Sequence, residues 1–271
     1  MTARRVRVDK LLVQRGLVAS REQAQTAIMA GLVRVNGSPA VKAGSLVAED
    51  AEVEVRGAGC PYVSRGGLKL ARAIEAFGLD LRDKTVLDVG ASTGGFTDCC
   101  LQMGARLVLA LDVGYGQLAW KLRQDPRVRV LERTNARYLT PELVGQEGDL
   151  AVIDVSFISL TLILPAVIPC LRQGGQVVAL IKPQFEAGRE KVGKRGVVKD
   201  PDVHREVIAR VMACGRAQGL APKGLTFSPL LGPEGNIEYL YWGGPAPGEV
   251  DDSMVPEVVA QAHAQLLKGE A

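Results

Sequence analysis

Cysteine and histidine are both scarce in this sequence, and their spacing excludes several common kinds of site. It has five cysteines, an odd number, and no two of them form a C-x-x-C pattern. A disulfide framework and a zinc site are therefore not expected, and no metal is predicted. The cysteines are interpreted as small apolar side chains in a reducing compartment: Cys60, Cys99, Cys100, Cys170 and Cys214.

Long apolar runs are absent as well. The longest, residues 158–171, has about 14 residues and contains Pro165 and Pro169, so it is too short to span a bilayer. The amino terminus is charged throughout its first turns and lacks the apolar centre of a signal peptide. Because 47% of the residues are hydrophobic, the chain can still bury a real core. The sequence therefore predicts a folded cytoplasmic protein.

Positive charge is concentrated in the first 42 residues. The whole chain has a formal net charge of +3, whereas this segment has eight basic and two acidic residues, a net charge of +6. A basic segment on a near-neutral body is typical of a unit that binds a polyanion, although a solvated basic face is an equal alternative. The basic residues are Arg4, Arg5, Arg7, Lys10, Arg15, Arg21, Arg34 and Lys42.

The first 56 residues are predicted to form a small unit of helices and short strands. One helical pattern ends at Gly16, and a second begins with a capping box made by Ser20 and Gln23. The pair Asn36-Gly37 lies between two short alternating runs and predicts a β-hairpin. A further strand is expected at residues 53–55.

Strand-like and helix-like segments alternate in the rest of the chain. A helix is expected at residues 66–77, and seven apolar runs with strand character follow, which begin at Thr85, Arg106, Val128, Asp149, Gly174, Ala221 and Asn236. This alternation predicts an α/β fold with a Rossmann-like, mainly parallel sheet. Only a turn separates the last two runs, so the last strand should be antiparallel. We place a small α+β unit at residues 1–56, a linker at 57–64 and the α/β domain at 65–271.

The glycine-rich stretch GASTGGF, residues 90–96, fits three kinds of functional loop. It matches the G-x-S-x-G elbow of serine hydrolases, but these need a histidine base, and His204 is expected at a helix surface and His263 in the tail. A dinucleotide loop would need glycine where Ser92 stands. A loop for S-adenosylmethionine (SAM), which has no phosphate, tolerates that serine. SAM is the favoured ligand, with a purely structural turn as the alternative.

The expected cofactor site lies at the carboxyl ends of the strands, where ligands bind in open α/β sheets. Asp112 ends the second strand and can accept hydrogen bonds from both ribose hydroxyls, while Asn135 follows the third strand and is placed for the adenine. The expected cofactor-binding residues are Asp88, Gly90, Ala91, Ser92, Gly94, Gly95, Phe96, Asp112, Val113, Asn135 and Asp154.

Two charged residues end apolar strands: Asp154 follows LAVI and Lys182 follows VVALI. Burying a charge is costly unless it is paired or used, so these residues are either catalytic or a structural ion pair. The stretch DVSF at Asp154 is faintly similar to the D-P-P-F box of enzymes that methylate base amines, but both prolines are missing. A ribose hydroxyl is a very weak acid and needs a group such as Lys182 to remove its proton.

Longer motifs resemble one known family. The stretches YVSRGGLKL, DVGASTGGFTD, DVGYGQLAW, ERTNAR, DVSFISL, KPQFE and GPEGNIEY are similar to those of the TlyA family, over nearly the whole chain. Its members are bacterial SAM-dependent ribosomal RNA 2′-O-methyltransferases, often labelled haemolysins. The segment RVRVDKLLVQRGLVASREQAQ, with VRVNG, resembles the small S-four RNA-binding domain. The resemblance implies S-adenosyl-L-methionine as cofactor, ribosomal RNA or ribosomal subunits as partner, and a monomeric enzyme.

The resemblance also implies a catalytic tetrad, Lys69, Asp154, Lys182 and Glu238. Lys182 would be the general base, or the charge that draws the hydroxyl proton away. A nearby Lys69 would lower the pKa of Lys182 by like-charge repulsion, and the two carboxylates would orient the ammonium groups. Thr93 stands where related heat-shock methyltransferases carry proline, which we interpret as a family variant.

A second basic cluster follows Lys182, in a glycine-spaced loop at residues 188–199. This loop is expected either to clasp phosphates of the target RNA or to be a solvated loop. Phe157 is the one candidate for stacking on the target base, with core packing as the alternative. The expected RNA-binding residues are Arg4, Arg5, Arg7, Lys10, Arg15, Arg21, Arg65, Arg189, Lys191, Lys194 and Arg195.

The sequence therefore predicts an enzyme that methylates a ribose 2′-hydroxyl, of a cytidine, in ribosomal RNA. Three alternatives stay open: a non-catalytic protein that binds ribosomal RNA or assists ribosome assembly, a base N-methyltransferase acting on RNA, and a membrane-damaging toxin. For the toxin, the tail at residues 256–267 offers the only candidate amphipathic helix.

Overall fold

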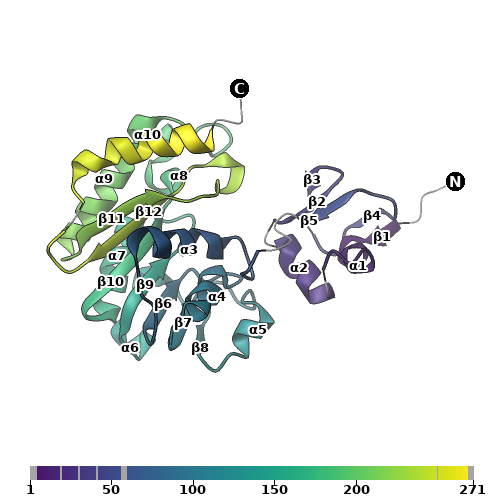
Figure 1. The fold of residues 1–271 in the computed structure, drawn as a ribbon, viewed down its shortest axis with the longest axis horizontal. Helices are drawn as coiled ribbons and strands as arrows, with labels where there is room; N and C mark the ends of the chain where they lie inside the picture. The colour runs from purple at the N-terminus through teal and green to yellow at the C-terminus, as the bar shows by residue number, and fades with distance from the viewer. Residues whose placement is uncertain are drawn as a thin grey trace.

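The computed structural model describes residues 5–18, 20–29, 31–40, 42–55, 60–248 and 250–267. A small amino-terminal unit and a larger α/β domain are visible in Figure 1, and each has its own hydrophobic core. Arg4, Arg56 and residues 57–59 of the predicted linker lie outside the described residues. Within the described part of the chain, none of the helices has the length and apolar character needed to cross a membrane.

The small unit contains two helices and five short strands. They are β1 (Arg5–Arg7), α1 (Val8–Gln14), α2 (Arg21–Met29), β2 (Val33–Val35), β3 (Ser38–Pro39), β4 (Leu46–Ala48) and β5 (Val53–Val55). Strand β2 pairs with β3 and β5, and β1 pairs with β4, all antiparallel. Strands β1 and β4 were not predicted from the sequence.

The helix cap and the hairpin turn that were predicted in this unit are confirmed. The Gln23 N–H donates to the Ser20 hydroxyl oxygen at 3.2 Å, which is the predicted cap of α2. Asn36 and Gly37 both have positive φ angles, 50° and 76°, as the tight turn between β2 and β3 requires.

A buried carboxylate joins the two helices of the small unit. Asp9 is fully buried and accepts hydrogen bonds from the Arg7 and Arg21 guanidinium groups at 2.9 and 3.0 Å. The Arg7 contact is the main reason that the pKa of Asp9 lies far below its usual range, against the opposing effect of burial. Because Arg7 and Arg21 are paired with Asp9, their guanidinium groups are less available to bind a polyanion.

The α/β domain begins with α3 (Gly66–Phe77), which matches the predicted helix and ends at Gly78 in a left-handed conformation. Its strands are β6 (Thr85–Val89), β7 (Leu107–Leu111), β8 (Val128–Leu131), β9 (Gly148–Ile153), β10 (Leu171–Ile181), β11 (Ala221–Phe227) and β12 (Tyr239–Gly244). Its other helices are α4 (Gly95–Gln102), α5 (Trp120–Arg123), α6 (Pro141–Val144), α7 (Leu160–Val167), α8 (Pro183–Glu186), α9 (Pro201–Ala217) and α10 (Val255–Leu266).

These strands form one seven-stranded sheet in the order β11-β12-β10-β9-β6-β7-β8. Strand β12 is antiparallel to both of its neighbours, and the pairs among β10, β9, β6, β7 and β8 are parallel. The predicted Rossmann-like sheet with an antiparallel last strand is confirmed. Strand order reverses between β6 and β9, so their carboxyl ends open the crevice where ligands bind in such sheets.

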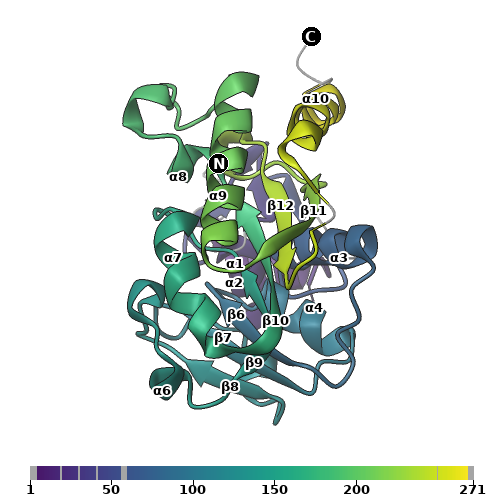
Figure 2. The same ribbon diagram turned by 90° about the vertical axis from the view of Figure 1, so that its left-hand side faces the viewer.

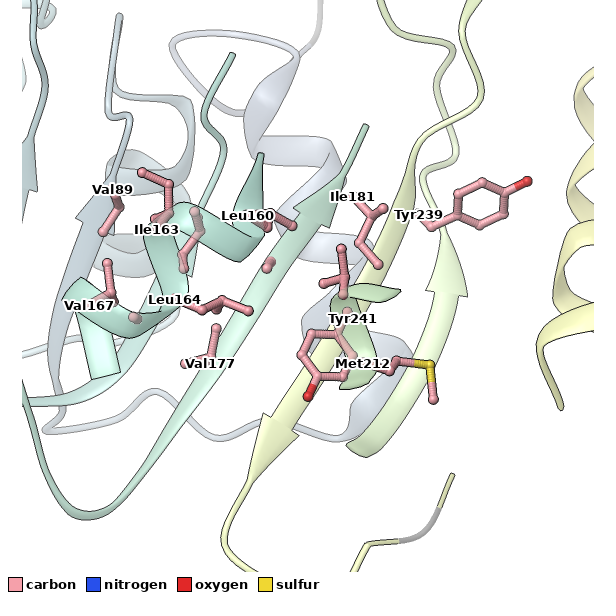
Figure 3. Packing of buried hydrophobic residues seen from close by; sticks show 14 of the residues in the cluster. Val89, Leu160, Ile163, Leu164, Val167, Val177, Ile181, Met212, Tyr239 and Tyr241 are labelled. Atoms are coloured by element: carbon pink, nitrogen blue, oxygen red, sulfur yellow. The ribbon is translucent and has the colours of Figure 1, made fainter. Parts of the chain in front are cut away.

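Helices cover both faces of the sheet (Figure 2). Buried residues of α3, α4 and α5 pack with one face in one cluster, and those of α7, α9 and α10 pack with the other face in a second cluster. Figure 3 shows the second cluster, with Ile163 and Leu164 of α7 near Val89 and Val177 of the sheet. Because α7 and α9 are fixed against the sheet in this way, the loops before them have rigid anchors.

The predicted start of the last strand is wrong. Strand β12 begins at Tyr239, three residues after the predicted start, because the side chain of Asn236 hydrogen-bonds a neighbouring loop through Gly196 and Val198. Glu238 therefore lies just before the strand and not within it.

Replacing Asp9 by alanine should destabilise the amino-terminal unit while leaving the α/β domain intact. Arg7 and Arg21 would lose their buried partner, at a cost of about 2–4 kcal/mol, which is large for so small a unit. Hydrogen exchange should show faster exchange at residues 5–55 alone. Glu22→Ala, an exposed carboxylate on α2, is the control. Equal protection in the Asp9 variant and the native chain would contradict this assignment.

Candidate active site

Two adjoining pockets lie at the carboxyl ends of β6, β7, β9 and β10. Their volumes are about 310 and 420 Å³, and both are lined by Gly90, Ser92, Asp154 and Ser156. The smaller pocket also contains Lys69 and Lys182, and the larger one contains Asp112 and Asn135. The crevice predicted from the strand order is therefore a real, two-part cavity.

The glycine-rich loop passes too close to its neighbours for side chains at two positions. A Cβ at Gly90, where φ is +90°, would lie 2.6 Å from the carbonyl oxygen of Asp154. A Cβ at Gly95 would lie 2.3 Å from the Ser64 hydroxyl oxygen. These glycines let the loop run between β9 and the start of α3, which leaves room above it for a ligand.

Asp112 joins the loops that follow β6 and β7. Its carboxylate accepts a hydrogen bond from the Ser92 N–H at 2.8 Å and another from the Gly114 N–H at 2.7 Å. Ser92 itself has a left-handed backbone, with φ at 48°. The two backbone donors hold the carboxylate in place at the larger pocket, where its remaining lone pairs can accept from hydroxyl groups of a ligand.

The predicted cofactor-binding residues are brought together only in part. Those that line the two pockets are Gly90, Ala91, Ser92, Gly95, Phe96, Asp112, Val113, Asn135 and Asp154. Gly94 lines neither pocket, and Asp88 lies behind the loop. Asp88 is fully buried and accepts a hydrogen bond from the Thr97 hydroxyl at 2.5 Å, and burial raises its pKa to about 7. Through this hydrogen bond Asp88 supports the loop where it enters α4, and its side chain does not face the cavity.

No histidine is available to activate Ser92 as a nucleophile. His204 is fully buried, which corrects the expectation that it lies at a helix surface. Its ring nitrogens lie 2.9 Å from the Val198 carbonyl oxygen and 2.8 Å from the Tyr239 hydroxyl. His263 lies 3.0 Å from the same ring. The hydrolase interpretation of the loop therefore lacks its base.

The four tetrad residues form two ion pairs. Lys182 Nζ lies 2.6 Å from Asp154 Oδ1, and Lys69 Nζ lies 2.6 Å from Glu238 Oε2. Lys182 is 8% exposed and Glu238 is fully buried. Segments that are far apart in the sequence supply these groups: the first turn of α3, the ends of β9 and β10, and the residue before β12.

Neighbouring charges keep Lys69 and Asp154 ionised. Burial alone would lower the pKa of Lys69, but the carboxylates of Asp154 and Glu238 outweigh it and raise that pKa. Burial alone would raise the pKa of Asp154, but Lys182 and Lys69 together lower it. Lys69 is therefore protonated, and it acts as a fixed positive charge between two carboxylates.

Residues that were not predicted as site residues complete the smaller pocket. The Lys182 ammonium donates to the Ser156 hydroxyl oxygen at 3.0 Å. Leu230, Leu231 and Gly232, from the turn before β12, line the wall beside Glu238. One Glu238 oxygen, Oε1, is buried without a hydrogen-bond partner among the described residues. Ser156 in DVSF and Gly232 in GPEGNIEY could have been found from their motifs, whereas Leu230 and Leu231 carry no comparable signal.

The aromatic ring of Phe157 lies at the rim of the larger pocket. Its side chain is 90% exposed, which excludes the core-packing alternative. The centroid of this ring lies 4.9 Å from that of Phe185 in α8. Phe157 thus presents a flat apolar surface next to Asp154.

Exposed basic residues surround the site on two sides. Arg65 lines the smaller pocket, and all four basic residues of the predicted glycine-spaced cluster are exposed: Arg189, Lys191, Lys194 and Arg195. Lys191 forms an ion pair with Glu206. The side-chain amide of Asn236 holds the base of this loop by donating to the Gly196 carbonyl oxygen at 2.9 Å. In the small unit, Arg5, Lys10 and Arg15 are exposed, whereas Arg7 and Arg21 contact Asp9.

Comparisons with known proteins agree with this geometry. The family described as FtsJ-like methyltransferase matches residues 62–245, and the S4 domain matches residues 6–53. A Mycobacterium tuberculosis protein named 16S/23S rRNA (cytidine-2′-O)-methyltransferase TlyA is 50% identical over 241 residues, 89% of this chain and 90% of the relative. Hemolysin A of Brachyspira hyodysenteriae is 42% identical over 87% of this chain and 98% of its own length.

A solved structure from Streptococcus thermophilus, which carries a hemolysin name, covers 98% of both chains with a TM-score of 0.78 and 48% identity. The sequence identity, the two matched domains and the shared architecture point to one conclusion. The chain belongs to the TlyA family of FtsJ-like methyltransferases with an amino-terminal S4 domain.

Proposed function

We propose that this protein transfers a methyl group from S-adenosyl-L-methionine to the 2′-hydroxyl of a cytidine ribose in ribosomal RNA. The observation that carries the proposal is the pair of buried ion pairs, Lys182 with Asp154 and Lys69 with Glu238, beside the glycine-rich loop. The name of the Mycobacterium tuberculosis relative, 50% identical, gives the same reaction for that protein. The protein would act in the cytoplasm as a monomer.

The cavity fits this cofactor in size and in polarity. Asp112 would accept from the ribose hydroxyls, Asn135 and Val113 would flank the base, and the Gly90–Gly95 loop would hold the amino-acid end. The side-chain oxygen of Asn135, Oδ1, already accepts from the Arg137 N–H at 3.0 Å, so its amide NH₂ would face the ligand. Gln117 also lines the larger pocket and would be a further contact. When bound, SAM supplies an electrophilic methyl group.

The tetrad would prepare the hydroxyl for attack. As a neutral amine Lys182 would accept the proton of the 2′-hydroxyl, or as a charge it would draw that proton away. Its contacts with Asp154 and Ser156 fix where its Nζ atom lies. Lys69 stays charged and would stabilise the developing alkoxide. Glu238 accepts from the Lys69 ammonium through Oε2 at 2.6 Å and would orient it. Holding the hydroxyl in attack geometry would supply much of the rate.

The RNA would be bound by charge more than by stacking. The exposed residues Arg5, Lys10 and Arg15 of the S4 domain would contact phosphates, and the loop at residues 188–199 would contact the backbone near the target. Phe157 would stack on the target base. Because phosphate contacts dominate, affinity should fall steeply with salt.

The alternatives differ in what they require of the site. A binding protein without catalysis gains nothing from four charges buried beside a cofactor-sized cavity, and burying them is costly. A base N-methyltransferase does not need a lysine paired with Asp154. No contact or surface among the described residues specifically favours a membrane-damaging toxin.

Methyl transfer can be tested directly with labelled SAM and separated ribosomal subunits from a strain that lacks the protein. The native chain should label the RNA of at least one subunit, and equilibrium binding should show a single cofactor site. Heat-denatured protein is the control. Cofactor binding without label on either subunit would contradict the proposal and favour the binding protein.

Lys182→Ala should abolish most turnover and leave cofactor binding intact. Loss of a general base lowers rates by about 10²–10⁴-fold. Methyl transfer at saturating RNA and SAM should fall by that range, while cofactor affinity measured by calorimetry stays the same. Lys84→Ala, at the amino end of β6, is the matched control. A fully active Lys182→Ala variant would make the lysine purely structural.

The basic face of the S4 domain should control RNA affinity. Lys10→Glu with Arg15→Glu reverses two exposed charges and should weaken RNA binding at least about tenfold at low salt, with a reduced salt dependence. Deleting residues 1–56 should abolish RNA methylation, and SAM binding should survive because the α/β domain has its own cores. Arg82→Glu, exposed before β6, is the control for a charge reversal outside the S4 domain. Methylation of subunits by the truncated protein would overturn this assignment.

A further inference from the structure

Two loops of the active site are joined by a series of side-chain contacts. One loop, residues 154–159, links β9 to α7, and the other segment, 182–186, follows β10 and forms α8. At one end Lys182 contacts Asp154 and Ser156, and in the middle Phe185 packs against Phe157. The far end of this series is closed by Glu186, a buried carboxylate that ends the KPQFE stretch and has no part in the proposed mechanism.

Glu186 holds the end of the loop with both carboxylate oxygens. Its Oε1 accepts from the Leu160 N–H at 2.7 Å, and its Oε2 accepts from the Ser159 hydroxyl at 2.6 Å. The side chain is 6% exposed. Arg210 of α9 fixes the same residue by donating to its main-chain carbonyl oxygen at 2.9 Å. The anchor is thus attached to α9, which packs in the core beneath the sheet.

The anchored loop needs such restraint. Phe157 has a φ of 64°, which is rare for a residue with a side chain, and its ring is 90% exposed, so core packing does not hold it. The residues on either side of it are fixed: Asp154 and Ser156 by Lys182, and Ser159 and Leu160 by Glu186. A helix cap alone would not explain the arrangement, because the Ser159 hydroxyl oxygen already accepts from the Thr161 N–H at 3.1 Å.

Burying the Glu186 carboxylate costs free energy, which a purely structural link between the two segments would not require. Burial raises the pKa of Glu186, against the hydrogen bonds from Leu160 and Ser159 and the charge of Arg210, which lower it. A neutral apolar contact would join the two segments without that cost. A carboxylate, however, accepts two hydrogen bonds with directional geometry, and this fixes the loop in one position.

We propose that Glu186 is a positioning residue for methyl transfer, which fixes the loop at residues 154–159 relative to Lys182 and so sets the place of Asp154, Ser156 and Phe157. The inference rests on the proposed function, since the positions it fixes are those of the attacking hydroxyl and its base. A shift of about 1 Å in such a site can lower the rate about 10²-fold. The same loop lines the larger pocket through Asp154, Ser156 and Phe157, so its position affects the proposed cofactor site as well.

The test compares Glu186→Ala, Glu186→Gln and Ser159→Ala in the full chain. Glu186→Ala should lower kcat at saturating RNA and SAM at least about tenfold, measured well below its melting temperature. Glu186→Gln should recover most of the activity, because the amide oxygen can accept from Leu160 and its NH₂ can donate to the Ser159 hydroxyl oxygen. Ser159→Ala removes one of the two contacts and should give an intermediate kcat.

Hydrogen exchange provides a readout that does not depend on activity. In Glu186→Ala, peptides covering residues 154–160 should exchange faster, while those covering β6 and α3 keep native protection. The matched control is Asp149→Ala, at the other end of β9, where a carboxylate accepts from the Thr85 N–H at 2.6 Å and pairs with Arg172. This variant should lose stability and keep its kcat.

Several outcomes would overturn the inference. One is native kcat in Glu186→Ala with only a lower melting temperature, and another is a glutamine variant as slow as the alanine variant. If Glu186→Ala does not fold, native kcat and native exchange in Ser159→Ala would overturn it as well. If the native chain labels no RNA, the proposed function fails, and the exchange at residues 154–160 still decides whether Glu186 holds the loop.

Discussion

The structure depends on two ion pairs buried at the carboxyl ends of the central strands. Removing four charges from water is costly, and only mutual pairing in good geometry offsets that cost. The fold provides this pairing by placing β9 beside β10, which brings Asp154 to Lys182, and by bringing Glu238 to Lys69 across 169 positions of sequence. The antiparallel last strand is essential here, because it returns the chain so that Glu238 arrives at the same edge of the sheet.

The same edge explains why cofactor and tetrad are neighbours. Gly90 ends the first strand of the domain against the Asp154 carbonyl, so the loop that would hold SAM touches the residue that pairs with Lys182. Asp112 then ties this loop to the next one through two backbone hydrogen bonds. Catalysis by positioning requires this kind of rigidity, since the hydroxyl and the methyl must be held close together before reaction.

Much of the fold could be predicted from the sequence, because its signals are local. The helix at residues 66–77, the capping box at Ser20 and the Asn36-Gly37 hairpin each rest on a few neighbouring residues, and the strands on continuous apolar runs. The tetrad came from resemblance to a family, since no local pattern joins Lys69 to Glu238. The burial of His204, the Asn236 contact and the role of Ser156 depend on tertiary packing, which a single sequence does not reveal. The contacts of Glu186 could not be predicted for the same reason, because its partners come from another loop.

The chemical identity of the methylated nucleoside tests the central claim most directly. Ribosomal RNA labelled by the native protein is digested to nucleosides, and the labelled product is separated by chromatography against standards. The proposed function, in which the tetrad removes a ribose hydroxyl proton, predicts label in 2′-O-methylcytidine. Label in a methylated base would contradict the role given to Lys182 and its partners, even though the protein would still be a methyltransferase.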